Sequence, residues 1–244
     1  MPGKATARKH GRGRKRDSER TRRAILSSAL KEFSQYGYSG TRIDRIAKMA
    51  KCNIRMLYHY FGSKEGIYIA VLERAYDDIR ARESELDLKR EEPLEGILKL
   101  MRFTFEYFAN NLQFEGLLHN ENMMRGRFVL RSKRVAQTAM PLRNALADLL
   151  RRGEASGVLR PGLDPVQIYV TIAALSRFHL ANAYSLSALL RTDLTLADWR
   201  KKRLSHACNL LQAYVVAPQH ASTRSLALRS ANRSVQRQPL SPSS

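Results

Sequence analysis

The stretch RTRRAILSSALKEFSQYGYSGTRIDRIAKMAKCNIRMLYHYFGSKEGIYI, residues 20–69, decides the fold. Its apolar spacing predicts a long amphipathic helix over about 18–36 and two short helices over about 41–50 and 53–60. Gly37 is a suitable stop for the long helix, and a tight turn separates the two short ones. This order predicts a helix-turn-helix that rests on a supporting helix.

Polar residues at the helix starts support these limits. Thr41 and Asp44 form a T-x-x-D pattern, which predicts a capping box for the first short helix. Asn53 is a good N-cap for the second short helix. Lys51, in the turn between them, is expected to need a left-handed backbone, which costs a residue other than glycine about 1 kcal/mol.

The remaining chain has helical apolar spacing and no convincing strand pattern, so it predicts an all-α fold. Asp164 before Pro165 and a second T-x-x-D pattern, Thr195 with Asp198, mark helix starts, while Gly153 marks a stop. The expected helices cover about 64–86, a segment from residue 93 onward, 114–124, 129–152, 165–184 and 195–215.

The composition indicates a folded, strongly basic protein. The 244 residues are 43% hydrophobic and carry a formal net charge of +21, concentrated at both ends but present throughout. Nucleic acid is the expected partner, and a solvated basic protein with adhesive tails is the alternative. Two distant cysteines without metal or disulfide spacing suit a reducing cytoplasm. Neither a signal peptide nor an apolar run of membrane-spanning length is found.

The helix-turn-helix region resembles the TetR family of transcriptional regulators. The resemblance covers about 20–72 and is carried by Phe33-Ser34-Gln35-Tyr36-Gly37-Tyr38, Thr41, Ile46-Ala47 and Leu57-Tyr58-His59-Tyr60-Phe61-Gly62-Ser63-Lys64-Glu65. It implies a dimeric DNA-binding protein with a larger helical domain for ligand binding and dimerisation. That second part resembles the family mainly in helix number and length, and is similar to the subgroup that includes the pyrimidine-catabolism repressor.

The expected domain limits follow from the pattern and the resemblance together. They are a disordered basic arm over 1–17, a helix-turn-helix domain over 18–64 (about 18–78 with part of the next helix), a ligand-binding and dimerisation domain over 65–216, and a disordered tail over 217–244. Within the arm, Arg12-Gly13-Arg14 either acts as a nonspecific electrostatic tail or enters an A·T-rich minor groove.

The start of the second short helix is expected to read base edges in the major groove. Arg55 can bind guanine through two hydrogen bonds, and Ile54 and Met56 can touch thymine methyl groups. The family commonly has Gly-Val-Ser where this chain has Lys51-Cys52-Asn53, and small or polar residues at 54–56. The operator sequence therefore cannot be taken from a relative.

Phosphate contacts are expected on both sides of these base contacts, within a helix-turn-helix of about 42–61. The start of the first short helix attracts anions through its free N–H groups. The resemblance implies further phosphate contacts, although Tyr58 and Tyr60 are also compatible with ordinary core positions. The candidates are Thr41, Arg42, Arg45, Tyr58, His59, Tyr60 and Lys64.

Two further sites are expected in the second part of the chain. Aromatic and polar residues suit a small-molecule pocket, although helical stripes of this kind also form ordinary cores; the candidates are Phe105, Phe108, His119 and Met123. The resemblance implies that the last two long helices pair with those of a second copy. The candidates for that interface are Ile172, Leu175, His179, Leu204, Ala207, Leu211 and Tyr214.

No catalytic motif is found: G-x-S-x-G, P-loop, GxGxxG and H-E-x-x-H patterns are all missing from the sequence. His119 and Glu121 are two residues apart and do not share a helix face, so they are not a metal pair. The missing motifs argue against enzyme activity, a metal or a cofactor, and the resemblance implies a homodimeric repressor released from a palindromic DNA operator by a small-molecule inducer. The alternatives are a nonspecific or architectural DNA-binding protein and an enzyme that uses the second domain.

Overall fold

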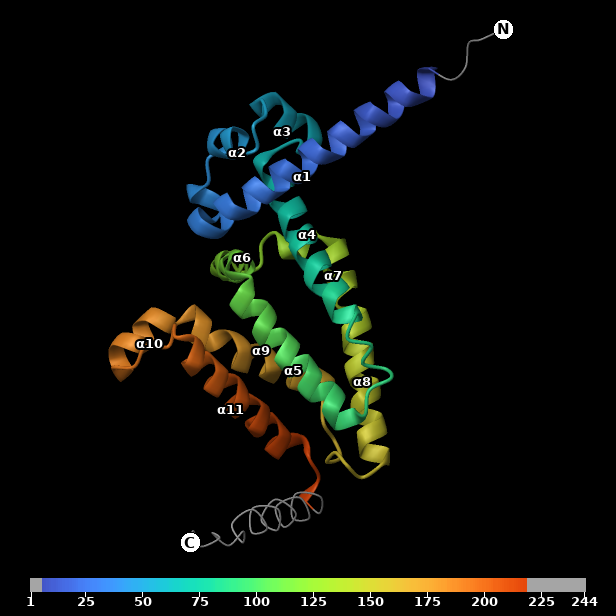
Figure 1. Cartoon of the computed structure of the whole chain (residues 1–244), viewed down its shortest axis with the longest axis vertical. Helices are drawn as coiled ribbons and strands as arrows, with labels where there is room; N and C mark the ends of the chain where they lie inside the picture. The colour runs from blue at the N-terminus through green and yellow to red at the C-terminus, as the bar shows by residue number, and fades with distance from the viewer. Residues whose placement is uncertain (1–5, 219–244) are drawn as a thin grey trace, which may run out of the picture. The chain divides into compact units, whose positions relative to one another are not determined.

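The computed structural model describes residues 6–218, and side chains from residue 16 onward. The predicted tail therefore lies, from residue 219, outside the described residues. The described chain is helical almost throughout (Figure 1), as predicted. It forms two compact units, residues 6–82 with 107–140, and residues 83–106 with 141–218. This division groups the chain differently from the predicted boundary at 64/65.

The first unit contains α1 to α4, α6, η1 and α7. Their limits are Thr6–Gly40 for α1, Ile43–Met49 for α2, Ile54–Phe61 for α3, Lys64–Ser84 for α4, Leu112–Met123 for α6, Val129–Arg131 for the 3-10 helix η1 and Lys133–Thr138 for α7. The start of α1 differs from the expected disordered arm over 1–17. Lys and Arg have high helix propensity, and they dominate this segment despite its two glycines.

Backbone turns of the helix-turn-helix follow most of the local signals. Gly37 has φ +66° and kinks α1 where a stop is predicted. Asn53 caps α3, since its side chain accepts a 2.9 Å hydrogen bond from the Arg55 amide. Lys51 has φ +52°, which confirms the left-handed turn. The predicted capping box is wrong: Arg42 is the N-cap of α2 without a side-chain bond, because the Thr41 hydroxyl donates to the Gly37 carbonyl.

Aromatic contacts hold α1 and α4 together. The Phe33 ring packs edge-on against Tyr68 with centroids 4.8 Å apart, and Phe128 lies 4.9 Å from Tyr68 and 4.5 Å from Tyr38. Phe33, Tyr68 and Phe128 are fully buried. Such pairs contribute about 0.5–1.5 kcal/mol each beyond their burial, so this cluster fixes the supporting helix against the start of α4.

Helix α6 crosses α1 closely. The Asn120 side-chain amide donates to the carbonyls of Phe33 and Ser34, at 3.2 Å each. Gly116 lies so near α1 that an added Cβ would come within 2.8 Å of the Ser34 carbonyl oxygen. A glycine is therefore needed at this crossing, and α6 contacts the helix that supports the helix-turn-helix.

The second unit is built on α5, α8, α9 and α11. Their limits are Pro93–Asn110 for α5 (to residue 106 within this unit), Met140–Ala155 for α8, Pro165–Ala181 for α9, Ala183–Leu190 for α10 and Ala197–Val215 for α11. Their inward faces form one apolar core, which includes Ile97, Met101, Leu146, Leu149, Ile172 and Leu211. No helix of the described residues is both long and apolar enough to cross a membrane.

Three helix limits in the later part of the chain correct the sequence-based ones. The expected helix over 129–152 is divided into η1, α7 and α8, because Ser132 caps α7 by accepting from the Val135 amide. Helix α8 continues past Gly153. The second T-x-x-D box does not form, since Thr195 bonds to Asp193. The Asp164 cap of α9 is confirmed by a 2.8 Å bond from the Gln167 amide.

Candidate nucleic-acid interface

Helix α3 presents its first turns to solvent on one side. Leu57 is fully buried and anchors the helix, while Ile54 and Tyr58 are 40% and 44% exposed. Arg55 and His59 are exposed and Met56 is half-buried. A short helix with a capped N-terminus and an exposed guanidinium has the dimensions and the donors to read base edges in a major groove.

The side chains at the start of α2 have fewer free hydrogen-bond donors than predicted. Arg42 is exposed and pairs with Asp44 at 3.2 Å. Thr41 is only 3% exposed, and its hydroxyl bonds inside the protein to Gly37 and Glu32. The Thr41 hydroxyl is therefore occupied, because the Gly37 kink brings a carbonyl within 2.6 Å of it, and a phosphate contact at Thr41 stays a prediction that only its backbone could meet.

Arg45 joins α2 to α1. Its guanidinium donates to the buried Glu32 carboxylate at 2.5 Å and to the Gly40 carbonyl at 2.9 Å. It also lies 4.3 Å from the centre of the Tyr36 ring. Most of its hydrogen-bonding capacity is thus used within the protein, where it orients α2.

Tyr60 and Lys64 also have partners inside the protein. The Tyr60 hydroxyl bonds to Ser18 of α1 at 3.0 Å. The Lys64 ammonium donates to the Thr41 carbonyl at 2.7 Å and lies 5.0 Å from the Tyr38 ring centre. Burial lowers the pKa of the Lys64 ammonium. Their phosphate contacts stay a prediction. In the structure, Tyr60 joins α3 to α1, and Lys64 joins α4 to the connection between α1 and α2.

Sequence reasoning missed some of the exposed cations on this surface. Lys48 in the last turn of α2 and Lys51 in the following turn are both exposed. Arg22 of α1 is exposed and lies 5.4 Å from the Phe61 ring centre. The available signal was their charge next to the predicted recognition helix, at positions outside the apolar stripes of the helices. These cations add positive charge around α3, which favours a polyanion.

The four predicted ligand contacts are divided between the two units. Phe105 is buried in the second unit and stacks on His179 with ring centroids 4.9 Å apart. Phe108 is buried against Phe114 in the first unit. His119 is exposed and Met123 is 74% exposed. The phenylalanines thus pack in cores and the other two residues face solvent, and a ligand site at these residues stays a prediction.

The predicted dimer residues are mostly core residues. Ile172, His179, Ala207 and Leu211 are at most 3% exposed within one protomer, and Leu175 and Leu204 are half-buried beside the same core. Tyr214 is 51% exposed, in agreement with an interface position. The other exposed apolar residues of α9, α10 and α11 are Val166, Val170, Phe178, Tyr184, Leu189, Leu190 and Leu210.

Known proteins with similar sequences are transcriptional regulators. Residues 25–71 match the family model for bacterial regulatory proteins of the tetR family, and residues 93–211 match that for the tetracyclin repressor-like C-terminal domain. The transcriptional repressor NicS of Pseudomonas putida is 34% identical over 190 residues, which cover 76% of this chain and 90% of NicS. The regulator RutR of Escherichia coli K12 is 33% identical, over 72% of this chain and 81% of RutR.

Solved structures agree with the fold. A TetR transcriptional regulator from Chloroflexus aurantiacus superposes with a TM-score of 0.61 at 20% identity, over 83% of this chain and 99% of that one. Reduced NemR of E. coli gives a TM-score of 0.58 at 22% identity, over 81% and 99%. Together with the exposed recognition helix, these findings show that the chain belongs to the TetR family of DNA-binding transcriptional regulators and is not an enzyme.

Proposed function

We propose that the chain is a cytoplasmic homodimeric repressor that binds a palindromic operator and is released by a small-molecule ligand. The observation that carries sequence-specific binding is the exposed Arg55 near the capped start of α3, beside Ile54 and Tyr58. A nonspecific basic protein has no need of a rigid, capped helix with these side chains at its surface. NicS is described as a repressor, which supports repression rather than activation.

The dimer follows from how little DNA one α3 can read. Two copies related by a twofold axis read the two halves of a palindrome when their recognition helices lie about 34–36 Å apart. The exposed apolar side chains of α9 and α11, among them Val170, Phe178 and Leu210, supply a surface for such pairing. Large apolar patches on a protein surface mark sites of protein–protein contact.

The experiment that tests this function is selection from a random DNA duplex library by the purified full-length protein, followed by footprinting of the selected sequence. We expect an inverted repeat whose half-sites are one helical turn apart and a footprint with sharp edges. Arg55→Ala, compared with the wild-type protein, should lose the preference for the repeat. Enrichment of no consensus, or protection that spreads along any duplex, would identify a nonspecific binder instead.

A further inference from the structure

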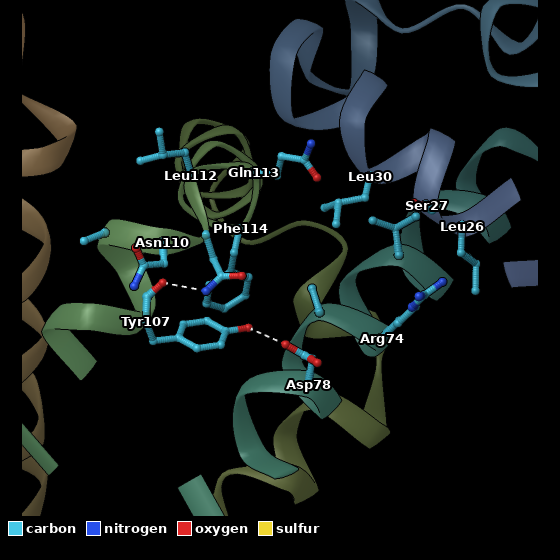
Figure 2. Close-up of a pocket in the computed structure, with 14 residues that line it drawn as sticks. Leu26, Ser27, Leu30, Arg74, Asp78, Tyr107, Asn110, Leu112, Gln113 and Phe114 are labelled. Atoms are coloured by element: carbon cyan, nitrogen blue, oxygen red, sulfur yellow. Dashed lines mark hydrogen bonds between the residues drawn. The ribbon is translucent and has the colours of Figure 1, made fainter. Parts of the chain in front are cut away.

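A cavity of about 610 Å³ lies in the first unit between α1, α4 and the junction of α5 and α6 (Figure 2). Its apolar wall includes Leu26 and Leu30 of α1 and Phe114 of α6. Figure 2 shows Gln113 at the start of α6 and Ser27 on α1. Pockets of about 300–1,000 Å³ with an apolar wall and a few polar groups suit small organic ligands.

Arg74, an exposed residue of α4, brings a guanidinium group to this cavity. One of its nitrogens donates to the Arg23 carbonyl at 3.2 Å, and within residues 16–218 no ion pair joins it to a carboxylate. Asp78 also lines the cavity, but its carboxylate accepts from the Tyr107 hydroxyl at 2.9 Å and pairs with Arg82 at 3.2 Å. The guanidinium is therefore left for an anionic group, which it can bind through two parallel hydrogen bonds.

We propose that the cavity is an effector site for a small organic carboxylate with an apolar body. Arg74 holds the carboxylate, and the leucines of α1 with Phe114 cover the apolar part. The polar side chains of Ser27 and Gln113 lie where they can bond to further oxygens of the ligand.

The effector role rests on the proposed function and on the position of α1. A ligand here touches the helix to which α2 and α3 are fastened, through the Arg45–Glu32 pair and the Tyr60–Ser18 bond. One turn beyond Leu30, α1 is crossed by α6 at Ser34 and Gly116. A ligand bound beside this crossing favours one packing of α1 on α6 over another. It changes DNA affinity by as much as its own affinity differs between the two arrangements.

The test uses octanoate as the carboxylate and octan-1-ol as its neutral analogue, titrated calorimetrically into the full-length protein. We expect octanoate to bind more tightly than octan-1-ol, and Arg74→Met to weaken it about tenfold or more, since a charge-assisted bond is lost. Arg134→Met is the matched control, because Arg134 pairs with Asp77 and does not line the cavity. Gln113→Trp, at an exposed edge of the cavity, should block binding while circular dichroism shows an intact fold.

The second measurement is the affinity for the selected operator with and without octanoate. We expect a change that Arg74→Met abolishes, and an equal change of octanoate affinity on adding operator. Absent binding, or binding that Arg74→Met leaves unchanged, would overturn the site. Arg74-dependent binding without any change in operator affinity would overturn the effector role. If no operator is selected, the proposed function fails, while the titration still decides whether the carboxylate site exists.

Discussion

The Lys64 ammonium donates a 2.7 Å hydrogen bond to the Thr41 carbonyl, and so joins the first turn of α4 to the connection between α1 and α2. The Tyr38 ring lies 5.0 Å from the same nitrogen. The Lys64 side chain thus holds the helix-turn-helix in position, whether or not it also contacts DNA.

Replacement of Lys64 by Met should destabilise the fold. Because a partly buried bond from a charged donor is lost, we expect the free energy of unfolding to fall by about 1 kcal/mol, measured by urea titration. Lys64→Arg, which keeps a donor, should lose less. If Lys64→Met leaves stability unchanged but lowers the salt dependence of DNA binding by about one unit, its main partner is a phosphate.

Arg55→Ala should weaken binding to the selected operator by about 1–3 kcal/mol and to random DNA much less, because a base contact supplies discrimination. Arg42→Ala is the matched control, since that exposed cation lies at the start of α2 and should affect both duplexes alike. Titrations at one fixed salt concentration compare them. If Arg55→Ala lowered the affinity for both duplexes equally, Arg55 would not read a base.

Lys51→Gly should stabilise the protein. Lys51 has φ +52°, a conformation that glycine adopts more easily, so the free energy of unfolding should rise by up to about 1 kcal/mol. Lys48→Gly, in the last turn of α2, should instead lower it by up to a similar amount, because glycine is a much poorer helix former than lysine. Thermal unfolding of the two variants gives the comparison. A lower melting temperature for Lys51→Gly would refute the strain argument.

Charge on the exposed face of the last helices should separate the protomers. Phe178→Glu and Leu210→Glu place a carboxylate at positions that are 60% and 46% exposed in one protomer, so each protomer should still fold. Light scattering after gel filtration should show monomers, and operator affinity should fall. Leu112→Glu, at a 64% exposed residue of α6, is the control that should remain dimeric. Dimers that persist in both variants would place the interface elsewhere.

The buried His179 should make the fold sensitive to acid. Burial, with the nearby Arg203 charge, lowers its pKa to about 4, so the imidazole is neutral in the folded protein while the unfolded chain takes up a proton near pH 6.5. Stability should therefore fall as the pH drops from 6.5 to 4, by at most about 3 kcal/mol. Urea titrations across this range measure the slope. His179→Gln should flatten it, and an unchanged slope would assign the effect to other groups.

Local signals sufficed for much of the helix-turn-helix. Asn53 acts through a side-chain bond to an amide two residues away, and Gly37 acts through its own backbone, so both roles can be read from local sequence. The Thr41 capping box was mispredicted because the kink at Gly37 places the Gly37 carbonyl 2.6 Å from the Thr41 hydroxyl, with the Glu32 carbonyl 3.3 Å away, and the residue pattern gives no sign of this kink geometry. The bonds of Lys64 and Tyr60 have a long-range origin.

The dimer face could not be chosen from the sequence for a different reason. Helix α9 is apolar on both sides: Ile168 and Ile172 face the protomer core, while Val170 and Phe178 are exposed. Periodicity identifies a helix with two apolar faces but not which of them another helix covers first. The cavity beside Arg74 was equally out of reach, because its wall combines residues from 26 to 114.

The apolar residues that α9 and α11 leave uncovered also bear on gene dosage. When only dimers bind the operator and most protomers are unpaired, operator occupancy rises with the square of the protomer concentration. Halving the synthesis of the protein then lowers occupancy about fourfold. A regulator with this surface responds to its own expression level as well as to its effector, and cell-to-cell variation in its abundance would be amplified at the promoter.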